Sequence, residues 1–524
     1  MPKVWIAFAL AAAVSAQKRP FPVVETSIAE MRAALKRGRV TSYELTRQYL
    51  VRIALHEDRL NAAITVNPRA LEEAAQRDRE KPRGPLHGIP IALKDNIHTM
   101  DLPTTGGALA FDGFRPPYEA TLVKNLRDAG AVILAKTGLT ELANWVAGGP
   151  TPMPGNYNAV AGFAFNPYDP RRDPRESTAD GRPALNTSGS SSGVGTAANF
   201  WAANAGTETS GSILSPANQN MLVGIKPTVG RVSRHGVIPI TADQDTAGPM
   251  ARTVGDAAIL LGALEGAAPD PNDPATTRCA PPPGRDYTKF LNPRGLKGAR
   301  IGIPRMFFYD AMDGRGGLSE PRKAAMDEAI AILKREGAIV VDPVELPSVS
   351  SGEYQRWGIC SGVGGAKGKD SGCSVVFKYG MKRDFNKWLA SLGPNAPVKT
   401  LAELRGFNRE HERMGAIRYG QSQLDISDEM DLEADRARYE DDRAKDIDLA
   451  GTRGIDAAMK THRLDALLFP ASDGSAIAAK PGYPTVIVPF AFVPNDSPPF
   501  PAGFDPSHLR WVSRLPRCLA PNLA

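Results

Sequence analysis

Two serine-containing turns decide the fold of this chain: GSSSG at residues 189–193 and TETSGSILSPA at residues 207–217. A short helix is expected between them, and each turn sets a serine among glycines. A serine becomes a nucleophile only when a neighbouring group takes its proton and backbone N–H groups stabilise the oxyanion. The second turn offers consecutive backbone N–H groups beside Ser212, which makes Ser212 a candidate nucleophile.

A candidate base stands upstream of both turns. In the segment LHGIPIALKDNIHT (residues 86–99), Lys94 ends an apolar, strand-like run, and the chain is expected to turn at Asp95 and Asn96. A lysine has an ordinary pKa of about 10.4. Burial disfavours its charged form, so a desolvated Lys94 would be available as a neutral base.

The lysine, the glycine-serine loop and the second serine, in that order, resemble the amidase signature family. Four segments are nearly identical to conserved motifs of that family: GIPIALKDNI, GTETSGSILSPA, VGIKPTVGRVSR and QDTAGPMARTVGDAA. The similarity runs from about residue 26 to about residue 504. The motifs GSSSG and GTET are most similar to those of the peptide-amidase branch. Leu214 also stands where many relatives carry arginine. The resemblance implies one large α/β domain, in which helices cover both faces of a mixed β-sheet.

The same resemblance implies a Ser-Ser-Lys relay. Ser212 would be the nucleophile, Ser190 the bridging serine and Lys94 the base behind it. Backbone N–H groups of the nucleophile loop would form the oxyanion hole, namely those of Thr209, Ser210, Gly211 and Ser212. The reaction would hydrolyse a carboxylic amide C–N bond through an acyl-enzyme.

The position of the bridging serine has three candidates. In relatives this serine follows a non-proline cis peptide bond, which is easiest to place after glycine, and this favours Ser190 after Gly189. Counting back from Ser212 by the family's usual interval leads instead to Ser188, because the helix start at residues 194–198 is about two residues short. Ser191 is the third candidate. An insert before the loop, PRRDPRESTADGRP (residues 170–183), is predicted to be a solvated surface loop.

The same residues match two other classes of protein. GSSSG also matches the nucleophile elbow of α/β-hydrolase esterases, with Ser191 as nucleophile. That motif needs an apolar strand before it, whereas residues 179–187 have the composition of a loop, and no downstream histidine lies in a matching context (His235, His411, His462 and His508). A non-enzymatic alternative is a catalytically impaired amidase-like binding protein, suggested by the short helix and an unusual C-terminal segment.

Composition agrees with a large hydrolase. The chain has 524 residues, 42% hydrophobic and 23% charged, with a net charge of +6. No basic run is interleaved with aromatic residues, so nucleic acid is not an expected partner. No histidine and cysteine cluster has metal-ligand spacing, so neither a metal nor another cofactor is expected. The expected partner is a small-molecule or peptide amide, whose acyl group the sequence leaves open, as it does the oligomeric state.

The two ends of the chain differ from its middle. Residues 1–16 have the pattern of a secretory signal peptide, with Lys3 followed by eleven apolar residues and a small-residue cleavage site. A secreted, extracellular enzyme is therefore expected, in which disulfides can form among its cysteines. Cys360 and Cys373 are the pair closest in sequence. Residues 505–524, DPSHLRWVSRLPRCLAPNLA, form a basic, aperiodic tail where relatives continue with a strand and a helix, so an exposed sheet edge is expected.

The amidase domain at residues 26–504 is expected to alternate helices and strands. Capping boxes predict helices over residues 27–38 and 41–57. A helix, a glycine stop and a strand are predicted over residues 121–137, and strand–helix–strand over residues 298–346. The charged residues 401–462 are predicted to form helices that cover one end of the cleft. Residues 418–421 resemble a segment that approaches the substrate in the peptide-amidase branch, which implies a position near the substrate. Late strands and pocket loops are predicted within residues 464–474 and 482–494.

Overall fold

The computed structural model describes residues 21–173, 180–185 and 192–494, together with the backbone but not the side chain of Ser191. The predicted signal peptide, the tail after residue 494 and the middle of the insert lie outside the described residues, so the predictions made for them stay predictions.

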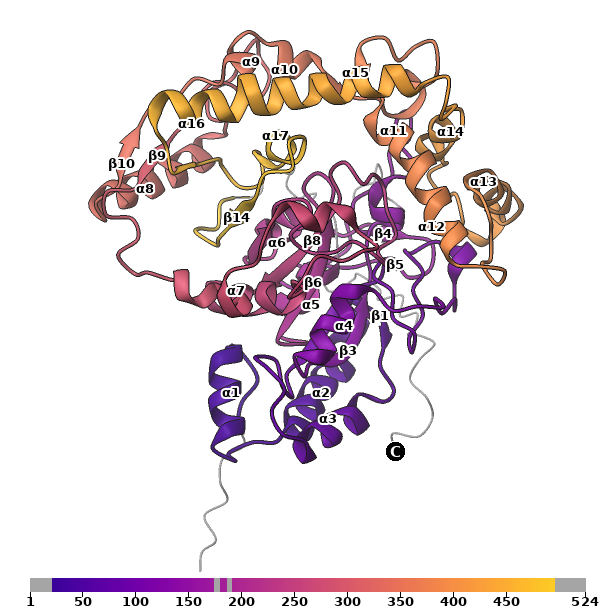
Figure 1. The fold of residues 1–524 in the computed structure, drawn as a ribbon, viewed down its shortest axis with the longest axis vertical. Helices are drawn as coiled ribbons and strands as arrows, with labels where there is room; N and C mark the ends of the chain where they lie inside the picture. The colour runs from indigo at the N-terminus through magenta and orange to yellow at the C-terminus, as the bar shows by residue number, and fades with distance from the viewer. Residues whose placement is uncertain (1–20, 174–179, 186–190, 495–524) are drawn as a thin grey trace, which may run out of the picture.

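A seven-stranded mixed sheet forms the centre of the molecule (Figure 1). Its strands lie in the order β1-β3-β2-β6-β8-β7-β14. β2 runs parallel to β3 and β6, whereas the pairs β1–β3, β6–β8, β7–β8 and β14–β7 are antiparallel. The strands are β1 (Ala63–Val66), β2 (Pro90–Lys94), β3 (Val132–Thr137), β6 (Ala203–Glu208), β7 (Val223–Lys226), β8 (Thr246–Ala251) and β14 (Thr485–Ile487). The mixed sheet predicted from the sequence is confirmed.

Helices pack on both faces of this sheet. Neighbouring residues of a strand point to opposite faces, and β8 shows the consequence: Ala251 joins the main hydrophobic core, while Met250 joins a second core beneath helix α6. The main core gathers side chains from the first helices of the chain and from α7. The helices on the two faces of the sheet are α1 (Ile28–Lys36), α2 (Ser42–Leu60), α3 (Ala70–Arg79), α4 (Thr121–Asp128), α5 (Ser191–Ala197), α6 (Leu214–Gln219) and α7 (Val254–Leu264).

The local signals in the first part of the chain are confirmed. Ser27 accepts a hydrogen bond from the Glu30 backbone, and the Glu30 carboxylate accepts one from the Ser27 backbone. Thr41 and Glu44 form the same reciprocal pair at the start of α2. Each pair satisfies two N–H groups that a helix start leaves without partners. α4 and β3 lie where the helix, glycine stop and strand were predicted.

A second, smaller sheet accounts for the later α/β alternation. It has three parallel strands in the order β10-β9-β13: β9 (Arg300–Gly302), β10 (Ile339–Val341) and β13 (Ala466–Leu467). Helix α8 (Glu320–Arg335) connects β9 to β10, and a separate apolar core lies against them. The predicted elements over residues 298–346 are therefore present, but they build this sheet and do not extend the seven-stranded one.

A helical cover, defined here as residues 376–462, arches over one end of the molecule (Figure 1). It consists of α11 (Val376–Gly380), α12 (Asn386–Ser391), α13 (Leu401–Glu410), α14 (Ser422–Asp428), α15 (Arg436–Ile447), α16 (Asp456–His462) and two π-helical turns, η8 (Met381–Phe385) and η10 (Asp448–Ile455). The helical character predicted for residues 401–462 is confirmed. An aromatic core that includes Trp145, Phe377 and Trp388 joins the cover to the segments that follow β2 and β3.

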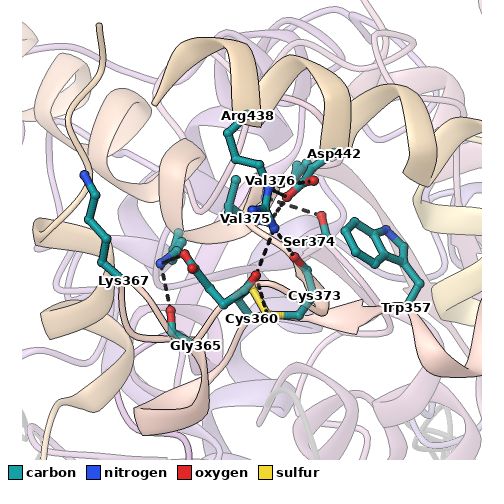
Figure 2. The surroundings of a disulfide bond; sticks show 12 residues. Trp357, Cys360, Gly365, Lys367, Cys373, Ser374, Val375, Val376, Arg438 and Asp442 are labelled. Carbon is teal, nitrogen blue, oxygen red and sulfur yellow. Dashed lines mark hydrogen bonds and ion pairs between the residues drawn. A yellow bond between two sulfur atoms is a disulfide. The ribbon is translucent and has the colours of Figure 1, made fainter. Parts of the chain in front are cut away.

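A disulfide between Cys360 and Cys373 closes the loop that leads into the cover (Figure 2). Arg438 of α15 donates to the backbone oxygen of Cys373 and to the Asp442 carboxylate. The fully buried Lys378 donates to Gly365 O at 2.7 Å. The loop is thus fastened both covalently and by hydrogen bonds. Besides short 3-10 turns, the other short elements are β4 (Tyr157–Asn158), β5 (Gly162–Phe163), β11 (Gly358–Ile359), β12 (Cys373–Ser374), α9 (Pro347–Ser350), α10 (Glu353–Arg356) and α17 (Ser475–Ala479).

Strand β14 forms one edge of the large sheet, and within the described residues it pairs with β7 alone. Apolar side chains stand exposed on and after it, including Val486, Val488 and Phe492, which are 57%, 53% and 69% exposed. A groove of about 980 Å³ runs between this edge and α8.

Among the described helices, none combines the length and the apolarity needed to cross a bilayer.

Candidate active site

Lys94 occupies the last position of β2, a strand whose five residues are all buried. Its Nζ donates a hydrogen bond to the backbone oxygen of Thr207 on the neighbouring strand β6, at 3.1 Å. Burial lowers the pKa of Lys94 to about 8, against the opposing attraction of the Glu208 and Asp245 carboxylates. Burial therefore favours the neutral form of Lys94, which is the form that a base requires.

The predicted nucleophile loop, residues 209–213, connects β6 to α6. Gly211 adopts a φ of +115°, a conformation that residues with a side chain rarely take. Ser212 follows it and is half-buried. A Cβ atom at Gly211 would lie 3.2 Å from the Ser475 hydroxyl of α17, so α17 closes over this turn. The loop thus places a reachable serine directly after a sharp backbone turn.

The buried carboxylate of Glu208 holds the C-terminal end of the same loop. Its Oε2 accepts hydrogen bonds from the backbone N–H groups of Ile213 and Leu214, at 2.7 and 3.0 Å. Burial raises the pKa of Glu208, while nearby Lys226 and these N–H groups oppose the rise. Sequence reasoning missed this role, although an acidic residue inside an apolar, glycine-rich motif was a signal for it.

Gln244 and Asp245, the two residues before β8, hold the N-terminal end of the loop. The Thr209 hydroxyl donates to Asp245 Oδ1 at 2.6 Å, and the Gln244 amide donates to Thr209 O at 3.1 Å. Burial raises the pKa of Asp245 to about 7, an effect reduced by the Thr209 hydrogen bond and by Arg234. These partners were also missed, because nothing in the sequence pairs residues 244 and 245 with residue 209.

The candidate bridging serines Ser188 and Ser190 lie outside the described residues, as does the side chain of Ser191. The next residue, Ser192, is described: its hydroxyl lies 2.7 Å from the Thr137 hydroxyl. Thr137 is the register partner of Lys94 between β3 and β2. The start of α5 therefore packs at the same end of the sheet as Lys94. The structure thus brings Lys94, the nucleophile loop and the start of α5 together.

The described residues before α5 provide no strand for a nucleophile elbow. Residues 180–185 form a turn and one isolated bridge between Pro183 and Arg172. Of the histidines considered for that alternative, His235 stacks on Tyr118 and His411 on Phe407. The esterase interpretation of Ser191 therefore has no support in these segments.

The insert is fastened where the structure describes its ends. Tyr419 donates its hydroxyl proton to Asp180 Oδ2 at 2.5 Å, and Arg418 donates to Asp180 O at 2.8 Å. Asp173, on the other described end, is buried. These ends are thus not the solvated loop that the composition suggested, because the cover binds one of them. The residues expected near the substrate, 418–421, contact the insert through Arg418 and Tyr419.

A family model described as Amidase matches residues 44–361. A probable amidase of Arabidopsis thaliana is 34% identical over 502 residues, covering 94% of this chain and 88% of the relative. This chain belongs to the amidase family. The solved peptide amidase of Stenotrophomonas maltophilia is 39% identical to this amidase, with a TM-score of 0.76 over 90% of this chain and 92% of that one. An amidase family protein of Bacillus anthracis is 32% identical, with a TM-score of 0.74 over 88% and 84% of the two chains.

The family and the fold together define the reaction class. This amidase is a serine hydrolase of amide C–N bonds, in the amidase signature fold.

Proposed function

We propose that this amidase works through a Ser-Ser-Lys relay, with Ser212 as nucleophile, Ser190 as bridge and Lys94 as base. The observation that carries the proposal is the burial of Lys94 beside β6, the strand that leads into the nucleophile loop. Its Nζ has a backbone oxygen as hydrogen-bond acceptor at 3.1 Å, and its pKa is lowered to about 8. A neutral lysine amine can accept a proton, whereas the charged form cannot.

The relay accounts for each proton of the reaction. Neutral Lys94 takes a proton from Ser190 as Ser190 takes one from Ser212, and Oγ of Ser212 bonds to the amide carbon. The oxyanion accepts hydrogen bonds from the N–H groups of Thr209, Ser210, Gly211 and Ser212. The proton then returns through the relay to the leaving nitrogen, and the C–N bond breaks. Water, activated by the same relay, hydrolyses the acyl-enzyme and restores Ser212.

We propose peptide C-terminal amides and small carboxylic amides as the substrate class. Support comes from the 39% identical peptide amidase of Stenotrophomonas maltophilia, whose fold covers nine-tenths of this chain. Aryl or indolyl acetamides and fatty acid amides are the alternatives to include in a substrate panel.

Labelling with a fluorophosphonate probe, followed by peptide mapping, tests the nucleophile. We expect modification at Ser212, and we expect Ser212→Ala to lower kcat by at least ~10³-fold, the usual cost of losing an activated nucleophile. Single alanine variants of Ser188, Ser190 and Ser191 identify the bridge, because only the bridging serine should approach the loss seen for Ser212→Ala. A folded protein that takes no label would favour the non-catalytic binding protein.

We further propose that residues 1–16 direct export. The Cys360–Cys373 disulfide supports this, because such bonds persist mainly in oxidising compartments. N-terminal sequencing of the protein recovered from the culture medium should give Gln17 as the first residue. Retention in the cell with Met1 intact would contradict export.

A further inference from the structure

Thr209 is the residue at which the nucleophile loop leaves the sheet. The last pair of the β6–β8 ladder is Glu208 with Thr246. Beyond that pair, Thr209 is held by side chains: its hydroxyl donates to Asp245 at 2.6 Å, and its carbonyl oxygen accepts from Gln244 at 3.1 Å. We call Gln244 and Asp245 the clamp. The clamp replaces ladder hydrogen bonds at the point where the loop begins.

The clamp is itself a closed, buried turn. The second carboxylate oxygen of Asp245 accepts the backbone N–H groups of Ile240 and Thr241, at 2.9 and 3.0 Å. The backbone N–H groups of Gln244 and Asp245 both donate to Thr241 O. The clamp residues are only 2% and 8% exposed. The Asp245 side chain and the backbone of Gln244 are thus fixed, and the Gln244 side chain is confined by burial beside Thr209.

The residue before the clamp ties it to the helical cover. Asp243 accepts hydrogen bonds from Arg383 at 3.1 Å and from the Tyr439 hydroxyl at 2.8 Å. Arg443 donates to its backbone oxygen at 3.3 Å. The clamp is therefore anchored on the side away from Thr209 as well.

Holding the Thr209 carbonyl has a direct geometric effect on the next N–H group. In a trans peptide the C=O of one residue and the N–H of the next point in opposite directions. The hydrogen bond from Gln244 thus fixes the direction of the Ser210 N–H. An oxyanion donor is effective only when it lies about 2.7–3.1 Å from the developing charge, so a rotation of this peptide plane would weaken it.

We infer that Gln244 and Asp245 are positioning residues of the oxyanion hole, which act through Thr209 to aim the Ser210 N–H at the carbonyl of the bound amide. The inference rests on the proposed function of Ser212. Neither clamp residue needs to touch the substrate. Their effect should fall on kcat, because the oxyanion exists in the transition state and not in the ground state.

The test compares Gln244→Leu and Thr209→Val with the wild type on N-acetyl-phenylalaninamide. Each variant removes one clamp hydrogen bond at nearly constant volume. We expect kcat to fall by ~10- to 100-fold, as for a misplaced catalytic donor, with KM within about threefold. The trifluoromethyl ketone with the same acyl group forms a tetrahedral oxyanion with Ser212, so its affinity should fall in proportion to kcat. Thr209→Ser, which keeps the hydroxyl, should return kcat to within about threefold of the wild type.

Gln48→Leu is the matched control, because Gln48 of α2, like Gln244, donates its side-chain amide to a backbone oxygen, here that of Phe21. It should leave kcat and ketone affinity unchanged. If Gln244→Leu does not fold, the Thr209→Val and Thr209→Ser pair decides. A kcat within threefold of the wild type in the folded variants, or a change confined to KM, would contradict the positioning role of Gln244 and Asp245. If the fluorophosphonate does not label Ser212 of the wild type, the proposed function is contradicted, and so is the positioning role that rests on it.

Discussion

Two fully buried lysines on adjacent strands illustrate how local contacts separate a candidate base from a structural cation. Lys136 of β3 lies 2.9 Å from the Asp95 carboxylate and also donates to Pro103 O and the Thr104 hydroxyl. Lys94 of β2 donates to a backbone oxygen, a neutral acceptor. Burial lowers the pKa of both lysines, but Asp95 opposes the effect directly at Lys136.

The pH dependence of catalysis should report the ionisation of Lys94. In the proposed relay the base acts in its neutral form, and burial lowers the pKa of Lys94 to about 8. We therefore expect kcat/KM to rise with pH through one ionisation near 8 and to level off on the alkaline side. Lys94→Arg, whose side chain stays protonated, should abolish the rise and most of the activity. A profile that is flat between pH 6 and 10 would count against Lys94 as the base.

Lys94 should also lower the stability of the fold at neutral and acidic pH. Its folded pKa of about 8 lies below the ordinary value of about 10.4. The unfolded chain thus binds the proton more tightly, and the resulting cost is complete below pH 8 and disappears as pH rises towards 10.4. We expect Lys94→Met to raise Tm at pH 6. Lys136→Met is the contrasting variant: it leaves Asp95 buried without its partner, so it should lower Tm, by an amount equivalent to ~3–5 kcal/mol. A lower Tm for both would refute the stated cost of Lys94.

At the scale of elements, the β6–loop–α6 unit depends on the Glu208 carboxylate. Glu208→Ala would leave the backbone N–H groups of Ile213 and Leu214 without their acceptor, at a cost of ~1–3 kcal/mol. We expect a lower Tm together with a lower kcat, because Ser212 lies between the two anchored ends. Glu208→Gln keeps one acceptor oxygen, so its Tm and kcat should lie between those of the wild type and those of Glu208→Ala.

Thermal melts and initial rates on the same preparations measure both effects. Glu353→Gln, at an exposed pair with Arg453, is the control and should change neither quantity appreciably. Unaltered kcat in a destabilised Glu208→Ala protein would limit Glu208 to a structural role.

The sequence predicts the elements of this fold better than their partners. Capping residues such as Ser27 and the apolar run ending at Lys94 are local signals, and both are confirmed in the structure. The pairing of Ala466 in β13 with Ile301 in β9 joins residues far apart along the chain, and periodicity carries no information about it. The Thr209–Asp245 contact is of the same kind. Motif spacing therefore predicted Ser212 and Lys94 as candidates but not the side chains that hold the nucleophile loop.

At the scale of the whole molecule, the disulfide fastens the loop that joins the small sheet to the cover. A closed loop of about 15 residues contributes roughly 3 kcal/mol in the chain-entropy model. Reduction should therefore increase the rate of tryptic cleavage at Lys367 and Lys369 by at least ~10-fold, within the loop that Figure 2 shows. Cleavage at exposed Lys289, outside this loop, is the internal control and should keep its rate. Equal acceleration at both places would indicate global unfolding.

The β14 edge should govern self-association. An exposed, apolar edge strand can pair with another chain, and Val486 and Val488 are more than half exposed there. Val486→Lys with Val488→Lys should reduce aggregation on heating, measured by light scattering, while kcat is unaltered. Val51→Lys on α2, where Val51 is 48% exposed, is the control and should have little effect. Equal suppression by the control would mean that added charge, and not the edge, is responsible.

The helical cover has a practical value for anyone who wishes to redirect this enzyme. Every residue we assign to the relay or to the hold on the nucleophile loop precedes residue 246, whereas the cover is a single later stretch, residues 376–462. Arg383, Tyr439 and Arg443 link it to the clamp through Asp243. A combinatorial library that keeps these three side chains and diversifies the rest of the cover would test whether the cover influences amide preference, while the residues assigned to the relay and the clamp stay unchanged.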